Sequence, residues 1–186
     1  ALTLPLALVL ALPAVASDGA VEINQTCAVQ TGCFAGDAAG FPVSIVAAGS
    51  YRLTSNLVVP NENTDGITVG ANDVGIDLGG FTLSGPVTCS GSPTTCSIPT
   101  GTGSGIEKLS ASSFGASVRN GTIVGMGNLG ILLGDGAIVT GVRVRSNRST
   151  GINVGLASVV SGCSADQNGG IGIEVNAGST VSGNAI

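Results

Sequence analysis

Apolar and polar residues alternate in short segments that recur at a fixed interval in the C-terminal half of the chain. The segment Gly-Ile-Leu-Leu at 130–133 returns as Gly-Ile-Asn-Val at 151–154 and as Gly-Ile-Glu-Val at 172–175, with the same interval both times. Segment 139–141 returns twice with the same offset, and segment 142–147 returns once. Side chains of a strand point alternately to opposite faces, so each segment reads as a short strand with one apolar face.

Three such strands in each period predict a three-sided coil with about seven residues on each side. Coils stacked at the usual strand spacing of about 4.8 Å would align Ile131, Ile152 and Ile173 in one internal column. Full burial of each of these side chains contributes roughly 1.5–3 kcal/mol, but only when another coil covers it. The predicted fold class is therefore all-β: a right-handed parallel β-helix, a three-sided solenoid of about 21 residues per coil with an N-terminal cap.

The residues expected at the corners support this interpretation. A corner needs a positive φ, which Gly adopts freely and Asn tolerates, and both residues recur between the predicted strands. Asn147 and Asn168 occupy equivalent positions and could form a ladder of side chains along the stack. A sandwich needs no such constant register, and the Leu-x-x-Leu-x-Leu pattern of leucine-rich repeats is absent.

Upstream the repeat is less regular. Segment 78–85 resembles 118–125, and we interpret the interval between them as close to two coils. Between them, 86–104 is rich in Pro, Gly, Ser and Thr and predicts a loop inserted into the solenoid. The expected organisation is a cap with the first strands at 17–60 and coils at 61–186, with a further coil or cap expected beyond Ile186.

Residues 1–16 are apolar and uncharged and end in Ala-Val-Ala, which is typical of a secretory signal peptide. The segment is short for a membrane span and is interrupted by Pro5 and Pro13. It lacks an initiator Met and a positive flank, so we expect it to be truncated. These features predict an exported protein that is secreted, periplasmic or attached to the cell surface. No later apolar run is long enough to span a membrane.

The cysteines fit an oxidising compartment. Cys27 and Cys33 lie close in sequence, as do Cys89 and Cys96, and we predict a disulfide within each pair. A zinc site is the alternative, but the chain has no His to complete it. The repeat places Cys163 inside the core as a small apolar residue.

The amino-acid composition argues against some classes of function. The 186 residues include 31 Gly and only 9% charged residues, against averages of about 7% Gly and about 25% charged. The net charge of −5 and the lack of basic clusters argue against nucleic acid as a partner. With no His there is no imidazole acid or base, and Ser and Thr lack a recognisable base, so we predict no catalytic residue in the chain.

The segments 49–53, 74–85 and 118–123 resemble the pectate-lyase-like superfamily of right-handed parallel β-helices. Within it they are most similar to exported bacterial β-helix repeat proteins of unassigned function. The resemblance covers roughly 20–186 and implies the fold, whereas the superfamily includes lyases, glycoside hydrolases, epimerases and adhesins. It also implies what an active site would contain: acidic residues around Ca²⁺ with a basic residue in the lyases, and clustered Asp in the hydrolases.

Two groups of charged residues are candidate sites. The first is an outward face predicted to bind an acidic polysaccharide or cell-surface glycan, formed by Arg143, Arg145, Arg148, Asp166 and Glu174. The simpler interpretation of Arg145 and Asp166, one coil apart, is an exposed ion pair that contributes at most about 1 kcal/mol.

The second group is Asp73 and Asp77, predicted to share a face and to be candidate Ca²⁺ ligands, with Asp65 as a neighbour. Ca²⁺ needs 6–8 oxygen ligands, so a polar edge is the simpler interpretation there.

We therefore expect a secreted or surface-exposed structural and interaction module that contacts glycans, with no catalytic activity evident in these residues and no cofactor. The alternative is a polysaccharide lyase or glycoside hydrolase whose catalytic coils lie beyond residue 186. An adhesin-like fibre is a third possibility, and the oligomeric state is open.

Overall fold

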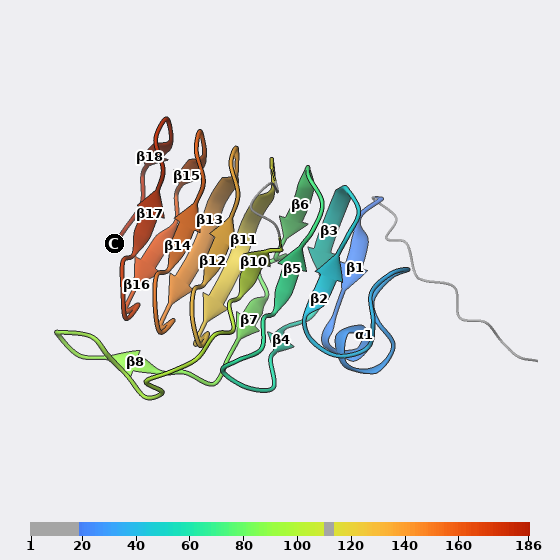
Figure 1. Cartoon of the computed structure of the whole chain (residues 1–186), viewed down its shortest axis with the longest axis horizontal. Helices are drawn as coiled ribbons and strands as arrows, with labels where there is room; N and C mark the ends of the chain where they lie inside the picture. Colours follow the sequence, from blue (N-terminus) through green and yellow to red (C-terminus); the bar gives the residue numbers. More distant parts are fainter. Residues whose placement is uncertain (1–18, 110–113) are drawn as a thin grey trace, which may run out of the picture.

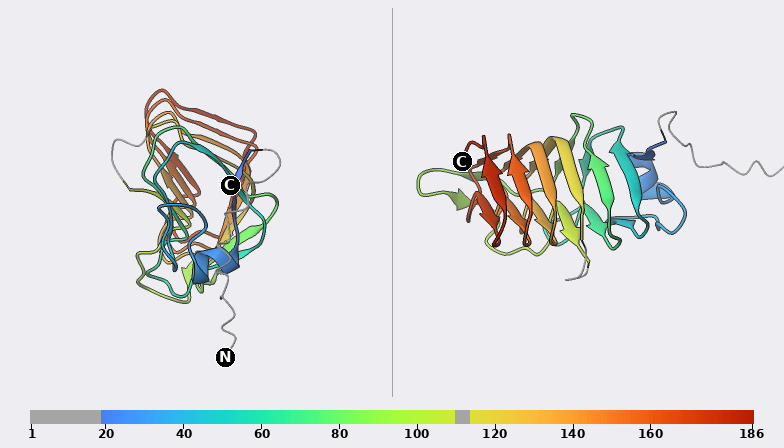
Figure 2. Two further views of the ribbon diagram at one scale, coloured as in Figure 1. Left: turned by 90° about the vertical axis from the view of Figure 1, so that its right-hand side faces the viewer. Right: turned by 90° about the horizontal axis from the view of Figure 1, so that it is seen from above.

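The computed structural model describes residues 19–109 and 114–186. They form a parallel β-solenoid of about six turns with a single short helix, and the coils stack along one axis from the N-terminal to the C-terminal end (Figure 1). The predicted three-sided parallel β-helix is thereby confirmed, and the view down the axis shows the coils superimposed on one another (Figure 2). The proposed signal peptide at 1–16 lies outside the described residues.

Each coil from β2 to β16 contributes one strand segment to each of three faces, because apolar and polar positions alternate in three short runs per turn. The first face contains β2 (Val43–Ile45), β5 (Ile67–Val69), β10 (Ile106–Lys108), β12 (Ile131–Leu133), β14 (Ile152–Val154) and β17 (Ile173–Val175). The second contains β1 (Val21–Ile23), β3 (Gly49–Leu53), β6 (Val74–Asp77), the first halves of β11 (Ser117–Val124) and β13 (Ile138–Arg145), β15 (Val159–Ser161) and β18 (Thr180–Ser182). The third contains β4 (Leu57–Val58), β7 (Thr82–Ser84), the second halves of β11 and β13, and β16 (Ser164–Asp166).

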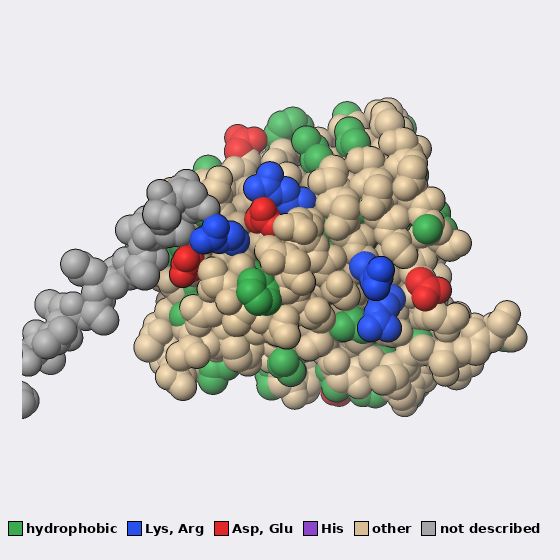
Figure 3. All heavy atoms as spheres, turned by 180° about the vertical axis from the view of Figure 1, so that it is seen from behind, with side chains coloured by type: hydrophobic (Ala, Val, Ile, Leu, Met, Phe, Trp, Pro, Cys, Tyr) green, Lys and Arg blue, Asp and Glu red, His purple; other side chains and the backbone are tan. Residues whose placement is uncertain are grey.

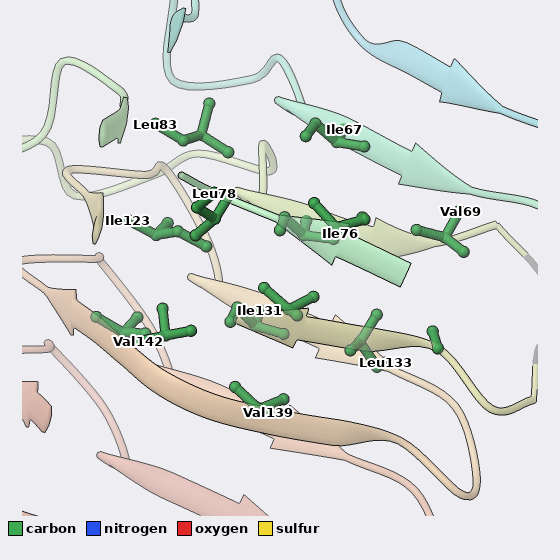
Figure 4. Packing of buried hydrophobic residues seen from close by; sticks show 14 of the residues in the cluster. Ile67, Val69, Ile76, Leu78, Leu83, Ile123, Ile131, Leu133, Val139 and Val142 are labelled. Carbon is green, nitrogen blue, oxygen red and sulfur yellow. The ribbon is translucent and has the colours of Figure 1, made fainter. Parts of the chain in front are cut away.

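Like residues stack on like residues in the interior. Ile131 pairs in register with Ile152, and Ile152 with Ile173, so the predicted internal column is confirmed. The column continues towards the N-terminus through Ile106, Ile67 and Val43. Side chains from the three faces point toward each other across the coil and fill it (Figure 4). Cys163 is a buried member of this core, as predicted.

The period is regular only in part of the chain. Register partners from β11 to β18 keep the constant interval of the sequence repeat, but the mean turn spacing is about 24 residues because the upstream corners are longer. The interpretation of segments 78–85 and 118–125 as two coils apart is wrong. Leu83 pairs directly with Ile123, so these strands belong to adjacent coils, and the extra residues lie in the inserted segment 86–104. An insertion adds length to a corner without adding a coil.

The predicted asparagine ladder is present, but its physical basis differs from the expectation. The positive φ at this corner falls on the preceding residues, Ser146 at 54° and Gln167 at 52°. Asn147 instead lies in the interior, with 0% exposure, and its Nδ2 donates to Oδ1 of Asn168 at 3.0 Å. The sharp bend between the second and third faces does use positive φ as predicted, with Gly141 at 60° and Asn120 at 60° one coil earlier.

The N-terminal end of the core is covered by α1 (Gln25–Gln30), whose Ala28 is fully buried. The Asn24 side chain caps this helix by accepting a hydrogen bond from the Cys27 amide.

Both predicted disulfides, Cys27–Cys33 and Cys89–Cys96, are present. The second one closes a hairpin of β8 (Cys89–Ser90) and β9 (Thr95–Cys96). Within the described residues, no helix has the length and apolar character needed to cross a membrane.

Candidate functional site

The third face carries the core of the predicted glycan-binding group. Arg143 pairs in register with Ser164, and Arg145 with Asp166, as the repeat predicts. The inward positions of these strands are filled by apolar residues, so the charged side chains are exposed to solvent. They line an open hollow of about 520 Å³ together with Ser164, Ala185 and Ile186. In the described parts of the chain, no carboxylate lies within ion-pair distance of either arginine.

Glu174 does not belong to this face, which corrects the predicted group. It lies on β17 of the first face, whereas Arg143, Arg145 and Asp166 lie on β13 and β16 of the third. Its Oε2 accepts a hydrogen bond of 2.7 Å from Nδ2 of Asn153, the residue in register with it on the neighbouring coil. Outward orientation on different strands does not place two side chains on one face, because the coil bends between them.

Arg148 also differs from the expectation. Its guanidinium group donates to three carbonyl oxygens: Gly127 at 2.6 Å, Pro99 at 3.3 Å and Gly101 at 3.3 Å. Two of these acceptors lie in the inserted segment 86–104. Arg148 is therefore a structural side chain that holds this segment against the solenoid, and it is not part of the glycan-binding group.

The two candidate Ca²⁺ ligands are in different environments. Asp73 lies in the turn before β6 with a φ of 54°, so the alternation that predicted a shared face with Asp77 does not extend to it. Oδ1 of Asp77 accepts hydrogen bonds from the Gly79 amide and from Asn120, and its Oδ2 accepts one from Nε of Arg119 at 2.9 Å. Asp65 accepts from the Ser104 amide on another corner. Among the described residues, no three His, Cys, Asp or Glu side chains are placed to hold a metal ion.

A ladder of alternating charges, which the repeat did not predict, crosses the second face. Glu22, Arg52, Asp77 and Arg119 occupy register positions on four successive coils. Arg52 contacts Glu22 at 3.4 Å, and Arg119 contacts Asp77 at 2.9 Å. Alternating acidic and basic side chains line this part of the surface (Figure 3). Arg52, Asp77 and Arg119 line a hollow of about 220 Å³. The small residues Ser50, Gly75 and Ser117 line it as well.

The charged side chains of this ladder pair with one another and stabilise the fold. They therefore do not offer an unpaired cation to a ligand. Partial burial on its own would raise the pKa of Asp77, but the hydrogen bonds from Gly79, Arg119 and Asn120 and the charge of Arg119 outweigh it and lower the pKa. The carboxylate is therefore ionised and already has donors on both oxygens. This separates the second face, where charges neutralise each other, from the third, where two arginines lie beside one aspartate.

We expect acid to weaken the fold partly through Asp77. Its pKa is lower in the folded chain than the ordinary value of 3.8, so its stabilising contribution is complete above that value and is lost as the pH falls through the folded pKa. Asp77→Asn removes the titrating group. Urea unfolding from pH 6 down to pH 2 should show a smaller loss of stability on acidification for Asp77→Asn than for the unaltered chain. Equal losses in the two proteins would contradict this role.

Comparison with protein-family models, with curated proteins and with solved structures finds no match to this chain.

Proposed function

We propose that this chain is an exported structural and interaction module, a rigid β-helical rod that contacts an acidic glycan through its third face without turning it over. The proposal also places the chain in the pectate-lyase-like superfamily, on the resemblance of segments 49–53, 74–85 and 118–123. The two disulfides are compatible with an oxidising, extracellular location, which supports export.

One observation carries the choice of ligand: Arg143 and Arg145 are exposed on one strand without a carboxylate partner among the described residues. The chain as a whole has a net charge of −5, so a local excess of positive charge on one face is unlike the rest of the molecule. Residues two apart on a strand point the same way, so both guanidinium groups can donate to one bound anion. A guanidinium group can bind a carboxylate or a sulfate in a bidentate way, through two parallel hydrogen bonds.

Asp166 and Ser164 would add selectivity to this face. Both lie in register with the two arginines on the adjacent coil. A carboxylate accepts hydrogen bonds from sugar hydroxyls and repels a second anionic group, whereas the Ser hydroxyl can both donate and accept. The arrangement suits a sugar chain with an acidic group on one unit and hydroxyls on the next.

Binding to immobilised polyuronates, sulfated glycans and neutral polysaccharides tests the proposal. We expect binding to the acidic glycans alone, weakened by salt because the contacts are exposed and ionic. Arg143→Gln combined with Arg145→Gln should weaken it by roughly tenfold or more, since each change removes a charged hydrogen-bond donor. Arg119→Gln is the matched control, because it removes an arginine whose partner is Asp77 and should leave binding unchanged.

Two results would contradict the proposal. Binding that is unaffected by the double variant would remove the third face as the contact surface. Release of unsaturated products or of new reducing ends from any glycan in the panel would favour the enzyme alternative.

A further inference from the structure

The inserted segment 86–104 forms a hairpin that runs along the solenoid rather than around it. It leaves the coil that ends in β7 and returns to the chain at β10 (Figure 1). In Figure 1 and in the right-hand view of Figure 2, the solenoid is seen from the side. In both views the end of the hairpin that contains β8 lies alongside the later coils and reaches toward the C-terminal end. Coils of a solenoid normally contact only their immediate neighbours, so a segment parallel to the axis is a departure from that rule.

The hairpin contacts three successive corners of the solenoid, two through its outgoing limb and the third through Cys96 on its returning strand. The Val87 amide donates to the Gly125 carbonyl at 2.8 Å, at the corner after β11. The sulfur of Cys89 lies 3.3 Å from the carbonyl oxygen of Ser146, at the corner after β13, and Cys89 is only 7% exposed. At the next corner, a Cβ added to Gly169 would lie 2.9 Å from the sulfur of Cys96. The disulfide therefore occupies space that a glycine leaves open.

The returning limb is fastened by hydrogen bonds to the same corners and to an earlier one. Arg148, one residue after the buried Asn147, donates to the carbonyls of Pro99 and Gly101. The Gly103 amide donates to the Glu62 carbonyl at 2.9 Å, and the Gly103 carbonyl accepts from Asn128 at 2.8 Å. The whole segment thus touches corners that belong to four different coils.

The disulfide is what keeps the hairpin in this shape. Strands β8 and β9 have two residues each, and an isolated two-stranded hairpin of that length is marginal in water. Without the cross-link, the gain in entropy of the 86–104 chain would favour its release from the corners.

We propose that the hairpin is a redox-sensitive staple, which ties the coils between β11 and β16 into one cooperative unit while Cys89–Cys96 is intact. A dithiol reductant opens it: the disulfide takes up two electrons and two protons and becomes two thiols, and the reductant is oxidised to its own disulfide. The corners at Asn147 and Gly169 then lose the contacts that the hairpin supplies, and the C-terminal coils open independently of the N-terminal ones.

Hydrogen exchange of the full chain under native conditions tests the staple. In Cys89→Ser combined with Cys96→Ser, amides of the C-terminal corners should exchange roughly tenfold faster than in the unaltered chain. The relevant amides are those of Arg148, Ser149, Gly169 and Gly170, each bonded to the preceding coil. The amides of Thr54 and Gly70, in the N-terminal coils, should not change. The matched control is Cys27→Ser combined with Cys33→Ser, which removes the other disulfide and should leave the C-terminal corners protected.

Cys163 provides a second readout, because it is the one cysteine of the five outside a disulfide and is 2% exposed. Its labelling by a maleimide should accelerate roughly tenfold in the Cys89→Ser/Cys96→Ser variant, since the thiol is reached only when its coil opens. Unchanged exchange at the C-terminal corners together with unchanged labelling would overturn the proposal.

If the double variant does not fold, Arg148→Gln provides another test. It keeps the disulfide, removes the hydrogen bonds that hold the returning limb, and should give the same local acceleration. Its absence would equally overturn the proposal.

Discussion

Replacing Ile131 with Ala should lower the free energy of unfolding by about 2–5 kcal/mol. Ile131 has 0% exposure and is held in register between Ile106 and Ile152, so the truncated side chain leaves a cavity in the internal column. The coils above and below cannot close this cavity, because their backbones are fixed by the hydrogen bonds of the parallel sheet. In a stacked architecture the loss also weakens two interfaces, one on each side of the altered coil.

Urea unfolding followed by circular dichroism measures this loss, and Leu132→Ala is its matched control. Leu132 is adjacent in sequence and equally large, but it lies at the outward position, in register with Glu107 and Asn153. Its truncation should cost less than about 1 kcal/mol, as is usual for a surface substitution. Similar losses for the two variants would mean that the inward and outward positions of this strand have been assigned wrongly.

The regular coils could be predicted from the sequence because their corners have constant length. Between β12 and β17 each period contains the same number of residues, so equivalent apolar positions can be aligned without knowledge of the structure. The same alignment located Arg143, Arg145 and Asp166 correctly on one face. It also located Asn147 and Asn168, although burial and hydrogen bonding, rather than a positive φ, explain why asparagine is found there.

The division of charged residues between faces could not be predicted from alternation alone. Alternation separates inward from outward positions, but Glu174 and Asp166 are both outward and still lie on different faces. What separates them is the set of bends within each coil, which depends on backbone conformations at residues such as Gly141 and Gln167. Arg148 was misplaced for a related reason, because its partners lie in an insertion that the repeat does not describe.

The charge ladder of the second face escaped detection because its members have no common interval. The steps from Glu22 to Arg52, from Arg52 to Asp77 and from Asp77 to Arg119 all differ in length, although each joins register partners on adjacent coils. A local signal did exist, since the first three are each flanked by apolar residues in the triplets at 21–23, 51–53 and 76–78. Alternating charges in such triplets could have indicated that these strands stack, even without a constant period.

Replacing Asn147 with Ala should lower the free energy of unfolding by about 2–4 kcal/mol, because its side chain forms buried hydrogen bonds in the asparagine ladder. Its Oδ1 accepts from the Met126 amide at 2.9 Å, and its Nδ2 donates to Asn168 at 3.0 Å. Removing the side chain leaves the Met126 amide buried without that acceptor. Such an unsatisfied donor costs more than the hydrogen bond contributes on balance, because water cannot reach it.

Asn153→Ala is the control that isolates burial as the cause. Asn153 also bonds to its equivalent on the next coil, Glu174, but on the exposed first face, where water replaces the lost partner. We expect its loss to stay below about 1 kcal/mol. Combining Asn147→Ala with Asn168→Ala should cost less than the sum of the single changes, since the two amides share one hydrogen bond. Urea unfolding of the four variants measures these terms, and equal costs for Asn147→Ala and Asn153→Ala would show that the ladder stabilises the coils no more than a surface contact does.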